Sequence, residues 1–286
     1  MSMLHVKEKI LYVVTSIRNP VLLEESYNKQ SSAYPMAPDR RNFKYEEAAV
    51  YGSQKELSIK NLSYKIGQDK ILDSLNMSFL PKKKYLILGD MDSGVDALIG
   101  ILTKKIQFYV GSVTINENNL KKINRKKLSG ELSLISKDIP IEEGDLIHNV
   151  VLAENFGIKE IRENLGRVGL FTKEEGEIKM ERQEYTDGER KRISVARALM
   201  NHSSILILDE TAGSEKNESD YELEELILNM REMTVLSISH KLTKSLMEKY
   251  DRIFIMDKGS IVEEGSFSEL LLNNDQFYKS YVSSET

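Results

Sequence analysis

The stretch Ile205-Leu206-Ile207-Leu208-Asp209-Glu210 places four consecutive apolar residues directly before two carboxylates. A second stretch, Tyr85-Leu86-Ile87-Leu88, is also continuously apolar and ends at Gly89. Runs of this length without polar alternation are typical of strands that are buried on both faces of a parallel sheet. The two runs therefore predict an α/β fold in which residues 85–88 and 205–208 lie in one sheet.

Helical and strand patterns alternate on either side of these runs. Apolar residues at helical spacing predict a helix over 95–102, which begins directly after Gly94. The sequence Asp257-Lys258-Gly259 predicts a hairpin turn with glycine at positive φ. We also predict an antiparallel β subdomain at about 55–85 and an α-helical subdomain at about 139–186. Further helices are predicted at 187–200 and about 219–232, and further strands at 112–115, 132–135, 234–239, 252–256 and 260–263.

Composition and charge exclude several classes of protein. The chain has 286 residues, a formal net charge of -5 and no cysteine. The acidic balance argues against a nucleic-acid partner, and the missing cysteines exclude disulfides and cysteine-ligated zinc. The best apolar stretch near the N-terminus, residues 10–23, contains Arg18 and Pro20 and is shorter than the ~20 apolar residues of a membrane span. We expect a cytoplasmic chain.

The first 53 residues differ in pattern from the rest of the chain. They open with apolar residues at helical spacing and continue into a polar, proline-containing stretch at 28–41. We interpret residues 1–53 as an N-terminal helix and linker, and residues 54–286 as the main domain.

A strand, a glycine loop and a helix follow one another at residues 85–102. The loop reads Gly89-Asp90-Met91-Asp92-Ser93-Gly94-Val95-Asp96, which has the G-x-x-x-x-G spacing of a phosphate-binding P-loop. A P-loop continues with lysine, which bridges phosphates, and with serine or threonine, whose hydroxyl binds magnesium. Val95 and Asp96 occupy these two positions and can do neither.

Three more segments resemble one family in their order and spacing. Residues 185–199 (YTDGERKRISVARAL) are similar to the ABC ATPase signature, residues 205–210 to its Walker B segment, and residues 234–240 (TVLSISH) to its switch strand. Over roughly residues 55–286 the chain resembles the nucleotide-binding domain of an ABC exporter. The resemblance implies a P-loop NTPase-type core and ATP with magnesium as cofactors. It assigns magnesium to Asp209, catalysis to Glu210 and His240, and nucleotide contacts to Gly89, Ser93, Gly94 and Ala97.

Other family positions are recognisable but less complete. Tyr64 lies where the family places an aromatic that stacks on adenine, and Thr186 and Gly188 lie in the signature that completes a partner's nucleotide site. Lys137 replaces the glutamine of the Q-loop, and Asp187 replaces a signature glycine. The D-loop is unrecognisable at 213–216. The N-terminal segment resembles the end of an exporter's last membrane helix.

These departures favour a degenerate nucleotide-binding domain, a pseudo-ATPase of an export system. The resemblance implies a dimer, and because the two sites of a homodimer would both be broken, we expect a second, non-identical ABC ATPase subunit. A membrane permease partner would place the chain at the inner face of the membrane. Two alternatives remain: a working ATPase in which Lys137 supplies the missing cation, and a soluble regulatory or scaffold protein that reuses the fold.

Both helix starts that would face phosphate carry carboxylates. Asp96 is predicted in the first turn of the helix at 95–102, and Thr186-Asp187-Gly188-Glu189 reads as a capping box. A helix N-terminus has about +0.5 charge and unpaired N–H groups, which is why it binds phosphate. We interpret these carboxylates as internal anions that stabilise the empty helix ends.

Overall fold

The computed structural model describes residues 56–90, 92–136, 140–142, 145–151, 156–171, 185–210, 218–240, 244–273 and 276–283. The predicted N-terminal helix and linker at 1–53, Lys137 and the D-loop at 213–216 lie outside these residues.

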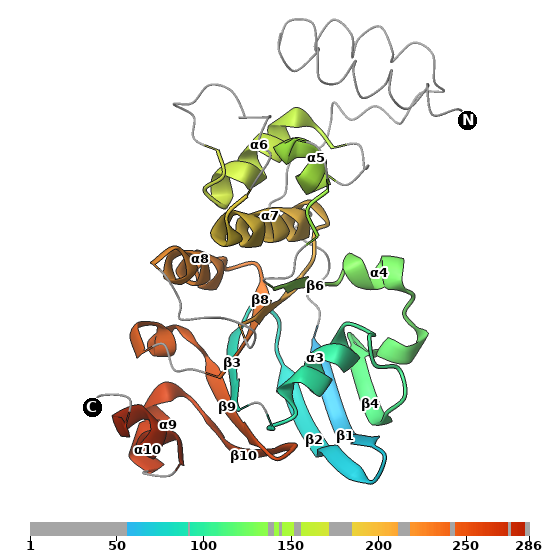
Figure 1. Cartoon of the computed structure of the whole chain (residues 1–286), viewed down its shortest axis with the longest axis vertical. Helices are drawn as coiled ribbons and strands as arrows, with labels where there is room; N and C mark the ends of the chain where they lie inside the picture. Colours follow the sequence, from blue (N-terminus) through green and yellow to red (C-terminus); the bar gives the residue numbers. More distant parts are fainter. Residues whose placement is uncertain are drawn as a thin grey trace, which may run out of the picture. The chain divides into compact units, whose positions relative to one another are not determined.

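A six-stranded sheet forms the centre of the fold (Figure 1). Residues 86 and 206 lie in this one sheet, as the apolar runs predict. Its strands from β9 to β6 are parallel, and β10 pairs antiparallel with β9 at the edge. The strand order is β10 (Ser260–Gly265), β9 (Arg252–Asp257), β3 (Lys84–Gly89), β8 (Thr234–Ser239), β7 (Ile205–Asp209) and β6 (Leu132–Ile135).

The antiparallel β subdomain is larger than the sequence predicts. It consists of β2 (Asp69–Phe79), β1 (Leu57–Ile66), β4 (Val110–Ile115) and β5 (Asn118–Asn119), in that order. The prediction of a subdomain at 55–85 was therefore wrong at its end, because β3 joins the parallel sheet and β4 joins β1 instead. Local patterns cannot reveal that β4 returns to β1 from about 50 residues away.

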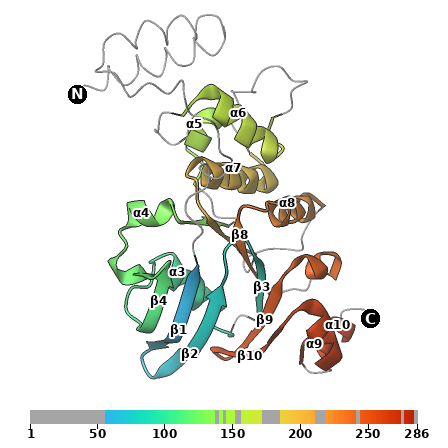
Figure 2. The ribbon, with the colours of Figure 1, turned by 180° about the vertical axis from the view of Figure 1, so that it is seen from behind.

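Helix α3 (Val95–Leu102) packs against the antiparallel sheet, and the core extends from it to both sheets (Figure 2). Fully buried residues of α3, β1, β2, β3 and β9 belong to one apolar cluster. Phe79 and Tyr85 meet edge to face at 5.0 Å, and Phe254 stacks on Tyr85 at 6.3 Å. Burying a side chain of this size stabilises the fold by about 1.5–3 kcal/mol, so these three rings hold β2 of the antiparallel sheet against β3 and β9 of the parallel sheet.

Helices α5 (Leu146–Val151) and α6 (Ile158–Arg167) pack on α7 (Asp187–Met200), which packs against β6. Helix α8 (Glu218–Leu228) ends four residues before the predicted end at about 232. The Lys84 ammonium donates to the carbonyl oxygens of Met230, at 2.7 Å, and Met233, which form a turn instead. No helix among the described residues is long and apolar enough to cross a membrane. The remaining helices of the described residues are η2 (Leu120–Lys122), α4 (Arg125–Ser129), η4 (Lys244–Lys249), α9 (Phe267–Asn273) and α10 (Gln276–Ser283).

Candidate functional site

Three of the predicted site segments meet at one edge of the parallel sheet. Strand β8 lies between β3 and β7, with Leu88 opposite Ser239 and Asp209 opposite Ile238. The glycine loop follows β3, His240 follows β8, Asp209 ends β7, and Glu210 follows it. Carboxyl ends of parallel strands are where open α/β sheets place their ligands. The fold therefore brings together the segments at 89–96, 209–210 and 240.

The glycine loop at 89–96 needs both of its glycines. A Cβ on Gly89 would lie 2.4 Å from the Ser93 hydroxyl oxygen. Gly94 has φ +89, and a Cβ there would lie 2.5 Å from the Ile71 carbonyl oxygen. The buried Ser93 hydroxyl donates to the Asp90 carbonyl oxygen at 2.6 Å, and the Ser93 N–H donates to the same oxygen at 3.0 Å. The loop is thus closed by its own hydrogen bonds.

The residue after the second glycine is buried in the hydrophobic core. Val95 has no exposed surface and belongs to the hydrophobic core, and Ala97 is also buried. Asp96 is exposed in the first turn of α3, and Gly94 at its N-cap supplies no side-chain hydrogen bond. Asp90 and Asp92 are exposed in the same loop. The start of α3 therefore carries three carboxylates and no cationic side chain between residues 89 and 97.

The β9–β10 turn supports this loop, a role that the sequence analysis missed. The Gly259 N–H donates to the Ser93 carbonyl oxygen at 2.9 Å, and the Asp73 N–H donates to the Gly259 carbonyl oxygen at 2.9 Å. Gly259 has φ +79, as the predicted turn requires. A Cβ there would lie 2.5 Å from the Ile71 carbonyl oxygen. Gly94 and Gly259 thus approach the same backbone carbonyl.

His240 contacts the loop directly. Its Nδ1 lies 2.5 Å from the Gly89 carbonyl oxygen. A carbonyl oxygen only accepts, so Nδ1 carries the proton in this bond. Asp209 and Glu210 are half-buried, and the Glu210 N–H donates to the Ile238 carbonyl oxygen at 2.9 Å.

A buried acid and phenol lie behind the end of β7. The Tyr250 hydroxyl donates to the Glu224 carboxylate, and both side chains are almost fully buried. Burial and the Glu224 carboxylate raise the pKa of Tyr250 well above its usual value, and the Glu210 charge acts in the same direction. Sequence reasoning missed this pair, because α8 and the end of η4 show no motif that joins them.

The predicted capping box is present at the start of α7. The Thr186 hydroxyl accepts from the Glu189 N–H at 3.3 Å, and the Glu189 carboxylate accepts from the Thr186 N–H at 3.0 Å. Asp187 is the exposed first residue of the helix. A Cβ on Gly188 would lie 2.8 Å from the Ser219 hydroxyl oxygen, so α8 packs closely here.

Tyr64 is predicted to contact the nucleotide, and it lies on β1. Tyr64, on β1, lines a cavity of about 600 Å³ near the end of α3, and no residue of the 89–96 loop lines that cavity. Lys137 lies outside the described residues. Among the described residues, no cluster of three or more acidic or histidine side chains is arranged to hold a metal ion.

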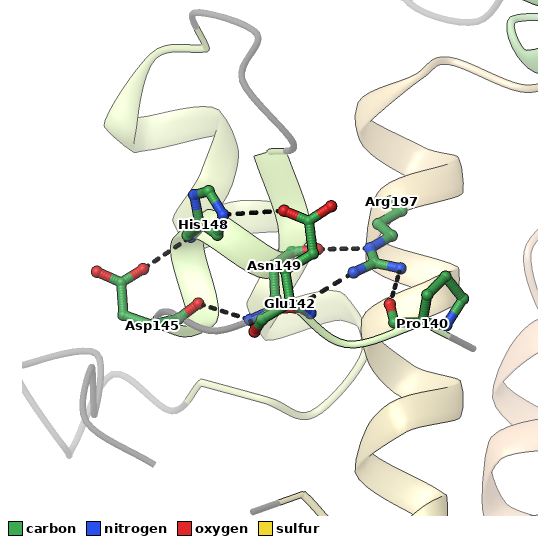
Figure 3. A network of polar contacts seen from close by, with 6 residues as sticks. All are labelled: Pro140, Glu142, Asp145, His148, Asn149 and Arg197. Atoms are coloured by element: carbon green, nitrogen blue, oxygen red, sulfur yellow. Dashed lines mark hydrogen bonds and ion pairs between the residues drawn. The ribbon is translucent and has the colours of Figure 1, made fainter. Parts of the chain in front are cut away.

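A polar network joins α7 to the segment before α5 (Figure 3). The Arg197 guanidinium donates to the backbone oxygen of Asn149, and to that of Pro140 at 2.9 Å. The fully buried Asn149 side chain accepts from the Glu142 N–H at 2.9 Å and donates to the Glu142 carbonyl oxygen at 3.0 Å. His148 adds an exposed contact to the Glu142 carboxylate at 3.2 Å. Helix α7, which contains most of the residues that resemble the family signature, is therefore hydrogen-bonded directly to Pro140 and α5, and through Asn149 to Glu142.

Comparison with known proteins gives a consistent result. A family model described as ABC transporter matches residues 72–213. The chain is 28% identical over 235 residues to the multidrug resistance protein fer6 of Mycosarcoma maydis, covering 78% of this chain and 17% of that protein. It is 25% identical over 237 residues to an ATP-dependent lipid A-core flippase of Francisella tularensis, covering 79% and 39%.

A transport protein and a solved structure extend the comparison. The chain is 26% identical over 258 residues to a glutathione/L-cysteine transport system ATP-binding/permease protein of Haemophilus influenzae, covering 87% and 44%. Its fold matches a bacterial Atm1-family ABC exporter with ATP bound at a TM-score of 0.69 and 17% identity, over 82% of this chain and 43% of that one. The chain spans less than half the length of these relatives. Together the fold and the matches show that the chain resembles the nucleotide-binding domains of ABC transporters of the exporter type.

Proposed function

We propose that this chain is a degenerate nucleotide-binding domain of an export system, with impaired binding and hydrolysis of ATP. The proposal rests mainly on the identity and burial of the two residues after Gly94. Val95 is packed in the core where the family has its phosphate-binding lysine, and Asp96 is exposed where the family has its magnesium-binding hydroxyl.

Electrostatics supports weak phosphate binding. A phosphate about 4 Å from one of these carboxylates is repelled by roughly 1 kcal/mol per charge pair at the dielectric constant of water, and by about 4 kcal/mol at an effective value of 20. Asp90, Asp92 and Asp96 all lie in the loop, and no lysine or arginine of that loop offsets them. The residues present do not fit magnesium-bound ATP at this loop.

The signature argues for a partner that differs from this chain. Asp187 adds a carboxylate at the start of α7, the helix end that would face a partner's nucleotide. A homodimer would combine two such helix ends with two loops that lack lysine. A non-identical ABC ATPase subunit would restore one intact element to each shared site. We propose that the chain acts in the cytoplasm with such a subunit and with a membrane permease.

Turnover by the isolated chain tests the proposal. We expect magnesium-dependent ATP hydrolysis no faster than that of Glu210→Gln, which removes the carboxylate that would polarise water. Turnover in the wild type that Glu210→Gln abolishes would instead identify a working ATPase. Light scattering tests the partner: a tight homodimer formed on addition of ATP would contradict the requirement for a different subunit.

A further inference from the structure

A basic surface lies directly after α3 and along η2 and α4. Residues 104–127 contain seven lysine or arginine residues and a single acidic residue, Glu117, in a chain whose net charge is -5. Six of the seven cationic side chains are exposed, and they define the basic surface: Lys105, Lys121, Lys122, Arg125, Lys126 and Lys127. A local excess of positive charge on an acidic protein attracts an anionic partner to that place.

The backbone beneath the basic surface is held in place by the core. Three apolar side chains of this segment are at most 5% exposed and belong to the hydrophobic core: Leu120, Ile123 and Leu128. The Asn124 side chain accepts from the Lys127 N–H at 2.8 Å and so caps α4. The Lys104 ammonium donates to the carbonyl oxygens of Lys121 and Ile123, which joins the end of α3 to η2. The exposed cations therefore project from a well-packed support.

Neighbouring carboxylates do not neutralise the basic surface. Within the described part of the chain, no ion pair joins any of its six cationic groups to a carboxylate. The Lys121 Nζ donates to the Tyr109 carbonyl oxygen at 2.9 Å and lies 4.2 Å from the centre of the Tyr109 ring. Both of these partners are uncharged, so the positive charge of Lys121 also lacks a counter-charge.

An aromatic side chain projects beside the basic surface. Phe108 is 91% exposed, the largest exposed fraction among the large apolar side chains of the described residues. Val110 is 73% exposed two residues further on. The contacts of Lys121 with Tyr109 hold this segment against the basic surface. Phenylalanine next to lysines is a combination with which proteins bind the surface of an anionic bilayer.

The identity of the cations favours a lipid surface over an acidic protein or a nucleic acid. Five of the six exposed cations are lysines and one is an arginine. Lysine is a flexible, hydrated point charge, whereas the planar arginine side chain forms paired hydrogen bonds with an individual carboxylate or phosphate. A surface of lysines therefore suits a layer of charged headgroups, which requires no fixed pairing. The acidic balance of the whole chain argues against a nucleic acid.

We propose that the basic surface binds an anionic phospholipid membrane, with Phe108 inserted among the headgroups. This is a direct contact of the domain with lipid, in addition to any contact with a permease. It does not depend on the proposed loss of ATP binding, because no residue of the 89–96 loop belongs to the surface. It can therefore be measured without nucleotide.

Sedimentation of the full-length chain with vesicles tests the surface. We expect binding to vesicles of mixed phosphatidylcholine and phosphatidylserine that weakens as the ionic strength rises, and much weaker binding to phosphatidylcholine alone. Lys122→Glu and Lys126→Glu should each weaken binding at least about tenfold, because one cation near an anionic bilayer strengthens binding roughly fivefold and each variant also adds a negative charge. Lys159→Glu, which changes an exposed lysine of α6, is the matched control and should leave binding unchanged.

Insertion has a readout of its own, because the chain contains no tryptophan. The fluorescence of Phe108→Trp should shift to shorter wavelength when the phosphatidylserine vesicles are added, and brominated lipid should quench it. Leu272→Trp is the control, because Leu272 is also exposed, at 84%, but lies on α9. Helix α9 contacts β10 and α4 contacts β6, which are opposite edges of the parallel sheet (Figure 1). The fluorescence of Leu272→Trp should not change.

Three results would overturn the proposal. Absence of binding to the mixed vesicles would contradict it outright. Vesicle binding that Lys122→Glu and Lys126→Glu weaken no more than Lys159→Glu does, or that leaves the fluorescence of Phe108→Trp unchanged, would place the lipid contact elsewhere on the chain. Retention on immobilised poly-glutamate without vesicle binding would assign the basic surface to an acidic protein instead.

Discussion

The His240 imidazole donates a hydrogen bond to the carbonyl oxygen of Gly89, which joins the end of β8 to the first glycine of the loop. The two residues are 151 positions apart in sequence and lie at the ends of neighbouring parallel strands. This histidine therefore stabilises the empty loop, together with the Gly259 N–H that binds the Ser93 carbonyl oxygen.

His240→Ala should lower the free energy of unfolding by about 1 kcal/mol, the net value of one hydrogen bond. His148→Ala is the control, because that imidazole makes only an exposed contact with Glu142 and should cost about 0.5 kcal/mol or less. Urea denaturation of both variants measures the difference. Equal losses would mean that the bond to Gly89 contributes nothing specific.

Gly259→Ala should destabilise the protein more than Gly67→Ala. Both glycines have positive φ, which costs an alanine roughly 1–2 kcal/mol. A Cβ on Gly67 meets nothing within 4 Å, whereas one on Gly259 lies 2.5 Å from the Ile71 carbonyl oxygen. The extra loss in Gly259→Ala, read from urea midpoints, measures the close approach. Similar midpoints would contradict this, because they would show that the turn shifts away from the Ile71 carbonyl oxygen with no loss of stability.

Asp96→Asn and Asp187→Asn should each lower stability by about 0.3–1 kcal/mol at low salt, because each carboxylate lies in the first turn of a helix. The loss should shrink at high salt, where the charge is screened. Thermal melts at two salt concentrations test this, with Asp69→Asn on a strand as the control. Unchanged or raised melting temperatures at low salt would show that neither carboxylate stabilises its helix end.

Burial lowers the pKa of Lys84 to about 8, so the folded chain releases this proton while the unfolded chain still holds it. Its contribution to the free energy of unfolding should therefore rise with pH between about 8 and 10.5, by about 1–3 kcal/mol. Lys84→Met lacks this dependence, and the stability difference between the two proteins measured across that range isolates it. A constant difference would contradict the lowered pKa.

The buried strands and the signature helix could be predicted from sequence because their signals are local. Strands β6 and β8 and helix α7 have the predicted bounds, and the capping box of Thr186 and Glu189 forms as its spacing predicts. The end of α8 could not be predicted, because the lysine that binds Met230 comes from β3, 146 residues away. The contacts of Gly259 with Ser93 and of Tyr250 with Glu224 could not be predicted either, because they also join residues that are distant in sequence. Periodicity reports which face of an element is buried, but not which distant side chain reaches it.

Binding of magnesium-bound ATP, measured by isothermal titration calorimetry on the wild type and on the double variant Val95→Lys, Asp96→Ser, tests the central proposal most directly. The wild type should bind no more tightly than about 1 mM. The double variant should gain at least about tenfold, because it restores a cation and a hydroxyl to the loop. The single variant Val95→Leu, which keeps an apolar residue, should behave as the wild type. Micromolar binding by the wild type would contradict the proposal that this loop has lost its affinity for the phosphates of ATP.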